Sequence, residues 1–350
     1  MFKSVVRGVF PSLISKDLIP DYFSFERSRP AGELDNEAST IVLPSSTNQS
    51  IPNPTIPSLP FYDYLFGDSQ QQKDHDQLSE YVAEKLRQVI QAPDALLKAL
   101  PVMPTSVTTA MQILQDDDFN VAELLQIIEK EPSMAADLVK LANTNQYKRG
   151  DKEVTDLHRA FMFMGAEGLV KGVVEVYLKQ YAVSPSLYFR QFGQKIWQHS
   201  NNTAQIARDL AQKCLPKDEV DTVYFVALLR NLGAMVIFQL MVDAFKYVDP
   251  DATPSSAHFK QLIATESISL VTRIAQHWQL PKTIIDILMQ QNSTAPTELS
   301  GAALSVYEGN LISEAKALLE SRRWQPTQYE KWLERKLFSA EAKQLVKDNL

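Results

Sequence analysis

The segment VALLRNLGAMVIFQL, Val226–Leu240, contains one polar pair, Arg230–Asn231, inside an otherwise apolar run. A guanidinium group carries only hydrogen-bond donors and a permanent positive charge, so Arg230 can pair with a carboxylate or hold a phosphate through two hydrogen bonds. Arginine repels a metal ion, and the neutral amide of Asn231 is a weak metal ligand. We favour pairing of Arg230 with a carboxylate, and anion binding is the alternative.

Other residues that could support chemistry are few. His199 shares its predicted helix face with Ile196 and Leu210, which favours a core histidine with satisfied hydrogen bonds over a metal ligand. Cys214 is the single cysteine, which excludes an internal disulfide and a thiolate metal cluster, and we interpret it as a buried structural thiol. The acidic run QDDDF at Gln115–Phe119 lacks the alternating ligands of a calcium loop.

Composition narrows the class of protein. The chain has 350 residues, 45% of them hydrophobic, and a formal net charge of −7. Binding to nucleic acid through the phosphate backbone needs clustered cations, so we expect no nucleic-acid partner. The longest apolar run is shorter than the roughly 20 residues that a bilayer requires, so we expect no membrane span and a cytoplasmic location.

The residues that could do chemistry depend on helices for their positions. From residue 76 onward apolar residues recur with a helical period, and no stretch alternates as a strand would, so we predict an all-α fold. The predicted helices include one that begins near Pro132 and one from Thr155 to Gly165. A further single helix is predicted over Val220–Leu240, and Thr297–Leu319 and Gln328–Val346 are predicted as the last two.

The first 75 residues have a different character. Residues 1–23 are predicted to form a short amphipathic segment that packs on its own protein or on a partner. Ser24–Pro60 is rich in proline, which favours extended chain over helix, so we predict an irregular linker or strap. If it is ordered, apolar residues should anchor it, namely Ile51, Ile56, Leu59 and Phe61.

Several spaced motifs agree in order with a known family. They are Leu100–Pro101 with Pro104, the helix start at Glu131–Pro132, the segment LANTNQY at Leu141–Tyr147, and Gly165 after a helix. Together they resemble the HDOD domain, a non-catalytic relative of the HD and HD-GYP phosphohydrolases, over about Leu97–Ser293. The resemblance implies a multi-helical HDOD/HD-like fold with two helical lobes.

The resemblance also implies where a metal pocket stood in the catalytic relatives. It matches the first ligand position to His199, the His-Asp pair to Arg230–Asn231, and the later histidines to Ser267 and Gln290–Gln291. The implied vestigial pocket comprises His199, Arg230, Asn231, Glu266, Ser267, Gln290 and Gln291. We expect these residues to lie near one another, Glu266 to neutralise Arg230, and no metal, cofactor or catalytic residue to be present.

The sequence divides into an N-terminal segment 1–75, a helical lobe 76–182, a degenerate HD-like lobe 183–293, and C-terminal helices 294–350 packed on that lobe. The resemblance implies bacterial signal transduction without catalysis, through contacts with other signalling proteins. Two alternatives remain open: a nucleotide-sensing domain that uses Arg230, and a residual metal-dependent phosphohydrolase.

Overall fold

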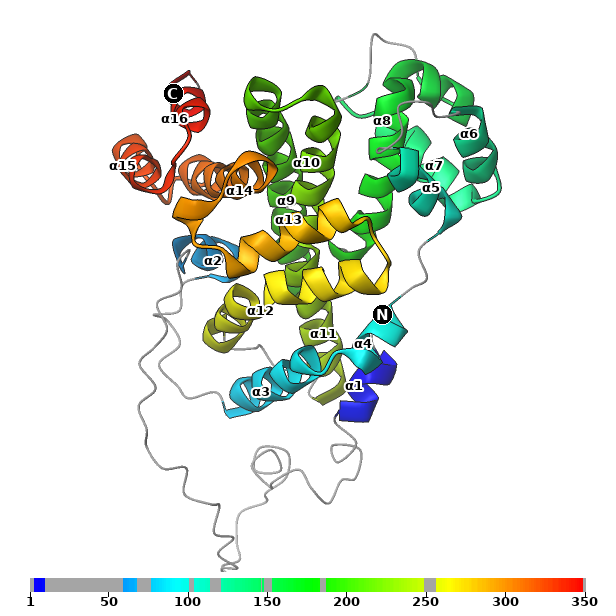
Figure 1. Ribbon diagram of the computed structural model, residues 1–350. Coiled ribbons are helices and arrows are strands. Elements are labelled where there is room, and N and C mark those ends of the chain that lie inside the picture. Colours follow the sequence, from blue (N-terminus) through cyan, green and yellow to red (C-terminus); the bar gives the residue numbers. More distant parts are fainter. Residues whose placement is uncertain are drawn as a thin grey trace, which may run out of the picture.

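The computed structural model describes residues 3–9, 59–67, 77–100, 104–113, 121–145, 147, 153–182, 187–248 and 256–348. Within these ranges the ordered elements are helices and no strand occurs, which confirms the all-α prediction (Figure 1). The α-helices are α1 Lys3–Val9, α2 Leu59–Phe66, α3 Gln77–Gln91, α4 Asp94–Ala99, α5 Thr105–Ile113, α6 Val121–Glu129, α7 Pro132–Ala142, α8 Leu157–Lys179, α9 Leu187–Cys214, α10 Lys217–Arg230, α11 Leu232–Val248, α12 Ser256–His277, α13 Lys282–Ser293, α14 Gly301–Glu320, α15 Pro326–Lys336 and α16 Ala340–Asp348.

Helices α5, α6, α7 and the first part of α8 pack on one another, at the upper right of Figure 1. The Glu131 carboxylate accepts hydrogen bonds from the backbone N–H and the hydroxyl of Ser106, 3.2 and 2.6 Å, which ties the start of α7 to the start of α5. Asn143 ends α7, and its amide bonds to the backbone of Val154 in both directions. Asn143 therefore serves as a helix-end residue that hydrogen-bonds to the following loop.

Helix α8 contains the break that the sequence predicts at Gly165. Asp156 caps its start by accepting the N–H of Arg159, and Gly165 has a φ of +73°, a backbone region that glycine adopts without steric cost. The second part of α8 leads through the short helix η4, Gln180–Ala182, to α9. It is buried and joins the α5–α8 group to the rest of the molecule.

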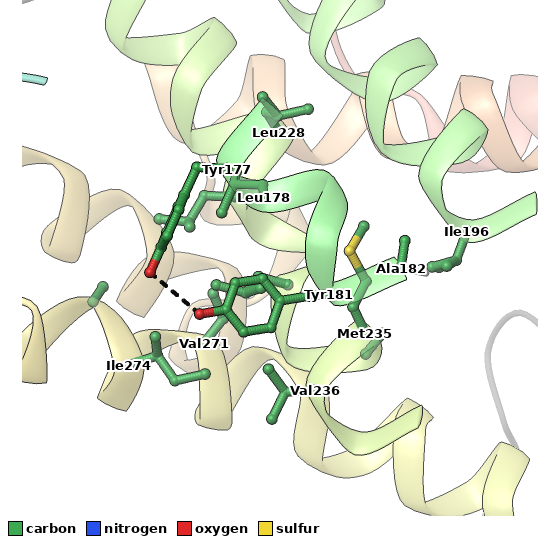
Figure 2. Packing of buried hydrophobic residues seen from close by; sticks show 14 of the residues in the cluster. Tyr177, Leu178, Tyr181, Ala182, Ile196, Leu228, Met235, Val236, Val271 and Ile274 are labelled. Carbon is green, nitrogen blue, oxygen red and sulfur yellow. Dashed lines mark hydrogen bonds between the residues drawn. The ribbon is translucent and has the colours of Figure 1, made fainter. Parts of the chain in front are cut away.

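The larger group of helices surrounds α9, which packs against α10 and α14, while α12 packs against α11 and α13. Figure 2 shows the core where the end of α8 meets α11 and α12. There the fully buried Tyr181 hydrogen-bonds its hydroxyl to that of Tyr177 at 3.3 Å, beside Val236 and Ile274. This core fixes α9 and α11, which carry or flank the candidate site.

The apolar run Val226–Leu240 is not one helix as predicted. Arg230 ends α10, and Asn231 is the single residue between α10 and α11. A Cβ on Gly233 would lie 1.9 Å from the carbonyl oxygen of Ser267, so the glycine permits a backbone approach between α11 and α12. Among the described residues, the stretch Glu219–Val248 is long and apolar enough to cross a membrane, but 94% of its most apolar window is buried, and core packing accounts for its composition.

The two ends of the chain also differ from prediction. The predicted C-terminal helix Gln328–Val346 is two helices, α15 and α16, because the Glu308 carboxylate accepts the backbone N–H groups of Phe338 and Ser339 and holds the chain in a turn there. Most of the predicted strap Ser24–Pro60, including Ile51 and Ile56, lies outside the described residues. The predicted end of the strap at Pro60 is wrong, because Leu59 and Pro60 begin helix α2, in which Phe61 is buried.

The described part of the predicted amphipathic N-terminal segment is α1, which buries Val5 and Val6 against the protein itself. Cys214 is exposed at the end of α9, so the interpretation of a buried thiol is wrong. A cysteine in the last turn of a helix is open to solvent unless another element covers it. The sequence around Cys214 does not reveal such coverage.

Candidate functional site

His199 lies in the middle of α9 and faces α14. It is 3% exposed, and both ring nitrogens have partners: Nδ1 lies 2.8 Å from Ser313 Oγ, and Nε2 lies 3.1 Å from Asn310 Oδ1. Burial, and then the nearby charge of Arg230, lower the pKa of His199 from 6.5 to about 3. The imidazole is therefore neutral at physiological pH.

The surrounding hydrogen bonds identify the tautomer. Asn310 Nδ2 donates to Glu314 Oε1 at 2.7 Å, which leaves Asn310 Oδ1 as a pure acceptor facing His199. The proton of the neutral ring is therefore on Nε2, and Nδ1 is an acceptor that shares the Ser313 hydroxyl proton with the His199 carbonyl, which lies 3.2 Å from Ser313 Oγ. Neither ring nitrogen has a lone pair available to a metal ion.

Arg230 reaches the same asparagine from the end of α10. Its Nη1 donates to Asn310 Oδ1 at 2.6 Å, so one amide oxygen accepts from both His199 and Arg230. Burial lowers the pKa of Arg230, while the negative charge of Glu314 raises it. We call His199, Arg230, Asn310, Ser313 and Glu314 the buried polar network.

The carboxylate that acts on Arg230 is thus Glu314 of α14, and the prediction that Glu266 neutralises Arg230 is wrong. Glu266 is partly buried on α12, where its carboxylate accepts a long hydrogen bond, 3.5 Å, from the neighbouring Thr265 hydroxyl. In the described part of the chain Glu266 makes no ion pair with Arg230. The physical reason is packing, because α10 lies against α14 more extensively than against α12.

The remaining predicted site residues have separate roles. The Ser267 hydroxyl donates to the Ile263 carbonyl within α12. Gln291 Nε2 donates to the Ala303 carbonyl at 2.8 Å and joins α13 to α14, whereas Gln290 is partly buried and makes no hydrogen bond to the network among the described residues. Of the seven predicted site residues, His199 and Arg230 are brought together by their hydrogen bonds to Asn310. Asn231 lies beside them because it follows Arg230 in the chain.

Two donors in this region have no hydrogen-bond partner among the described residues. They are Nε of Arg230 and Nδ2 of Asn231, both inaccessible to solvent. Buried donors without partners are unusual because each has lost its hydrogen bonds to water. They are the features of the site that an added acceptor, such as an anion, could satisfy.

Helix α2 closes the site from a distant part of the chain. The ring of Phe61 lies against the imidazole of His199, with centroids 4.5 Å apart. Tyr62 belongs to the same electrostatic environment: burial raises its pKa, the charge of Glu314 raises it further, and Arg230 lowers it. Helices α9, α14 and α2 therefore enclose the buried polar network.

The residues do not fit the divalent metal of the catalytic relatives. Both nitrogens of His199 are committed to Ser313 and Asn310, and the adjacent side chain is the cation Arg230. Within the described ranges, no group of three His, Cys, Asp or Glu side chains could hold a metal ion. The arrangement can hold charge and hydrogen bonds, and it offers no ligand set for metal-assisted hydrolysis.

The sequence reasoning missed Asn310, Ser313 and Glu314 of α14, and Phe61 and Tyr62 of α2. A signal for the first three was present, because they are polar residues within the helical segment SVYEGNLISEA, all nearly buried in the structure. The same feature, polar residues within an apolar helical segment, drew attention to Arg230–Asn231. Nothing local to α2 indicates that it packs on residues more than a hundred positions later.

Comparison with known proteins gives a family and a fold. The HDOD domain model matches residues 100–294, more than half of the chain. An HDOD domain protein of unknown function from Geobacter sulfurreducens superposes with a TM-score of 0.51 at 18% identity, over 76% of this chain and 93% of that chain. A candidate metal-dependent phosphohydrolase from Shewanella amazonensis SB2B has a TM-score of 0.51 at 17% identity, over 75% of this chain and 92% of that chain. No curated protein matches the chain.

Proposed function

The chain belongs to the HDOD family, and from that premise we propose that it is a non-enzymatic regulatory module that acts through contacts with other signalling proteins. The family relation suggests a signalling-related domain. The proposal includes a bacterial, cytoplasmic setting, no nucleic-acid partner and no membrane span. Its finer part, the absence of catalysis, depends on the site.

The observation that carries the proposal is the shared oxygen of Asn310, which accepts from both His199 and Arg230. In a metal-dependent hydrolase the histidine must present a lone pair and its neighbours must be anionic or neutral ligands. Here the histidine is saturated and its neighbour is a cation. A domain with this fold but without a set of metal ligands is suited to regulation through contacts with other proteins.

The test is elemental analysis of protein purified without chelator, together with hydrolysis of a phosphodiester in the presence of manganese. We expect no stoichiometric metal and no turnover, and the same result for His199→Ala. Stoichiometric metal together with turnover that His199→Ala abolishes would contradict the proposal. Affinity purification of the native protein then identifies its partners.

A nucleotide-sensing role is the second candidate, and the unpartnered donors of Arg230 and Asn231 favour it. A phosphate group would accept from both donors, and Arg230 provides the charge. A thermal-shift screen with cyclic dinucleotides tests this role, with Arg230→Met as the control variant. Stabilisation of the native chain alone supports it, and equal melting temperatures with and without nucleotide contradict it.

A further inference from the structure

Helix α2 is held by residues that are remote in the sequence. It packs on α9, α12 and α14. Phe66 lies against Phe192 with ring centroids 4.4 Å apart, and Phe61 lies against His199. We call Phe192, Lys195, His199 and Lys260 the α2 seat.

Two lysines of the seat recognise the carboxyl end of α2. Lys195 donates to the Tyr64 carbonyl at 2.7 Å, and Lys260 donates to the Gly67 carbonyl. The last carbonyls of a helix lack intrahelical partners and carry partial negative charge, so cations bind them favourably. Lysines at this position recognise a helix that ends there, whatever its side chains.

Side chains of α2 add a specific pattern to this recognition. Lys260 is 0% exposed and forms an ion pair of 2.6 Å with Asp63. Phe61 and Leu65 are buried, and Gly67 has a φ of +88°, which glycine adopts freely as it ends the helix. The seat therefore contacts two aromatic side chains, Phe61 and Phe66, together with one acid four residues before a glycine and a helix end.

The helicity of α2 depends on the seat. Isolated helices shorter than about 12 residues are marginal in water, so the eight residues Leu59–Phe66 need tertiary contacts to stay helical. Residues 10–58 separate α2 from α1, and residues 68–76 separate it from α3. In its contacts α2 thus resembles a bound peptide that folds as it docks.

We propose that the α2 seat is a docking site for a short helix of a partner protein, and that α2 occupies this site in cis. The partner helix carries aromatic or apolar residues in place of Phe61 and Phe66, an acid in place of Asp63, and a glycine at its end. Its binding displaces α2, and its own apolar residue takes the place of Phe61 against His199. This inference rests on the proposed protein-contact function and names the surface that would serve it.

A labelled peptide with the sequence Leu59–Gly67, blocked at both ends, tests the seat by fluorescence anisotropy with the full chain. The double variant Phe61→Ala with Phe66→Ala weakens the cis helix, so it should bind the peptide at least about tenfold more tightly than the native chain, in which α2 competes at high effective concentration. The same peptide with Asp63→Lys is the matched control and should bind neither chain. Equal or absent binding by a folded double variant overturns the proposal.

Hydrogen exchange of the native chain provides a test that needs no variant. Backbone amides of α2 should exchange at least about a hundredfold faster than those in the middle of α9, because α2 leaves its seat by local opening. Excess peptide should accelerate their exchange further. Amides of α2 that exchange as slowly as those of α9, with or without peptide, overturn the proposal.

Two further measurements identify the occupant of the seat and separate the docking site from the proposed function. A concentration-dependent dimer that the peptide dissociates would identify a second copy of this chain as the occupant and overturn the partner assignment. Manganese-dependent hydrolysis is measured on the same preparation. Turnover that His199→Ala abolishes contradicts the proposed function itself, whereas absent turnover with absent peptide binding contradicts only the docking site.

Discussion

Lys171 of α8 and Arg230 of α10 are both cations withdrawn from solvent, yet they are neutralised in different ways. Lys171 pairs directly with two carboxylates, Glu167 one turn earlier and Asp221 of α10 at 2.8 Å. Arg230 donates to the neutral amide of Asn310, which in turn donates to a carboxylate. The first arrangement joins α8 to α10 by ion pairs. The second links a cation to a carboxylate through the amide of Asn310, which also accepts a hydrogen bond from His199.

The difference shows which cation depends on partners that water cannot replace. The carboxylates of Lys171 are 52% and 34% exposed, so water can solvate them if the lysine is lost. The members of the buried polar network have no such access, apart from the partly buried Arg230. Removing one member of that network should therefore cost much more than removing Lys171.

The largest effect is expected from Asn310→Ala. This change removes the hydrogen bonds that Arg230, His199 and Glu314 make to Asn310, and each buried group left unsatisfied costs about 1–3 kcal/mol. Urea unfolding of the native chain and of Asn310→Ala measures the loss in the free energy of unfolding. The control is Asn201→Ala, which removes one bond within α9, and it should cost about 1 kcal/mol. Similar losses in the free energy of unfolding for the two variants would show that Asn310 does not link the other members of the network.

Glu175, one turn after Lys171, should give the next effect, and it depends on pH. Burial raises its pKa from 4.5 to about 7, and its Oε2 has no partner among the described residues. The folded chain therefore holds a proton that the unfolded chain loses, so stability present below about pH 4.5 is lost as pH rises through 7. Glu175→Gln should raise the free energy of unfolding by up to about 3 kcal/mol at pH 8, and by little at pH 5.

Glu167→Gln is the matched control on the same helix. Partial burial raises the pKa of Glu167, but the hydrogen bond and charge of Lys171 outweigh it and hold that pKa below its usual value. The control should therefore lower stability at pH 8, the opposite sign from Glu175→Gln. If both variants stabilise the chain at pH 8, net charge rather than the burial of Glu175 is responsible.

A smaller effect is expected from Lys171→Met. Methionine fills a similar volume, and the two released carboxylates can reach water, so the free energy of unfolding should change by no more than about 1 kcal/mol. Denaturant unfolding measures it, with the exposed Lys140→Met as the control. A loss of about 3 kcal/mol or more would place Lys171 in the same class as the buried polar network.

The smallest effect concerns the titration of His199 after Arg230→Met. Burial and then the charge of Arg230 depress the pKa of His199, so removing the charge should raise that pKa while burial keeps it below 6.5. Histidine ring signals followed by NMR against pH measure the shift, and Arg87→Met on the surface provides the control. An unchanged pKa would mean that Arg230 does not act on His199 electrostatically.

Features that depend on a few adjacent residues could be predicted from the sequence. Pro132 at the start of α7 and Gly165 within α8 determine helix boundaries through their own backbone geometry. The helical period and the absence of alternation predicted the all-α fold. The poor metal-binding capacity of Arg230–Asn231 could be predicted from the sequence, because residue type alone decides whether a side chain can coordinate a metal.

Features that depend on which helices meet could not be predicted in this way. The acid beside Arg230 is Glu314 rather than Glu266, and the cover over His199 is Phe61 of α2, because the packing of α9, α12 and α14 sets these distances. The break at Asn231 likewise accompanies the close approach of Gly233 to Ser267. The sequence by itself determined the all-α fold class and the polar pair Arg230–Asn231, whereas the tertiary structure decided which buried charges and rings satisfy one another, since several of those contacts join segments more than a hundred residues apart.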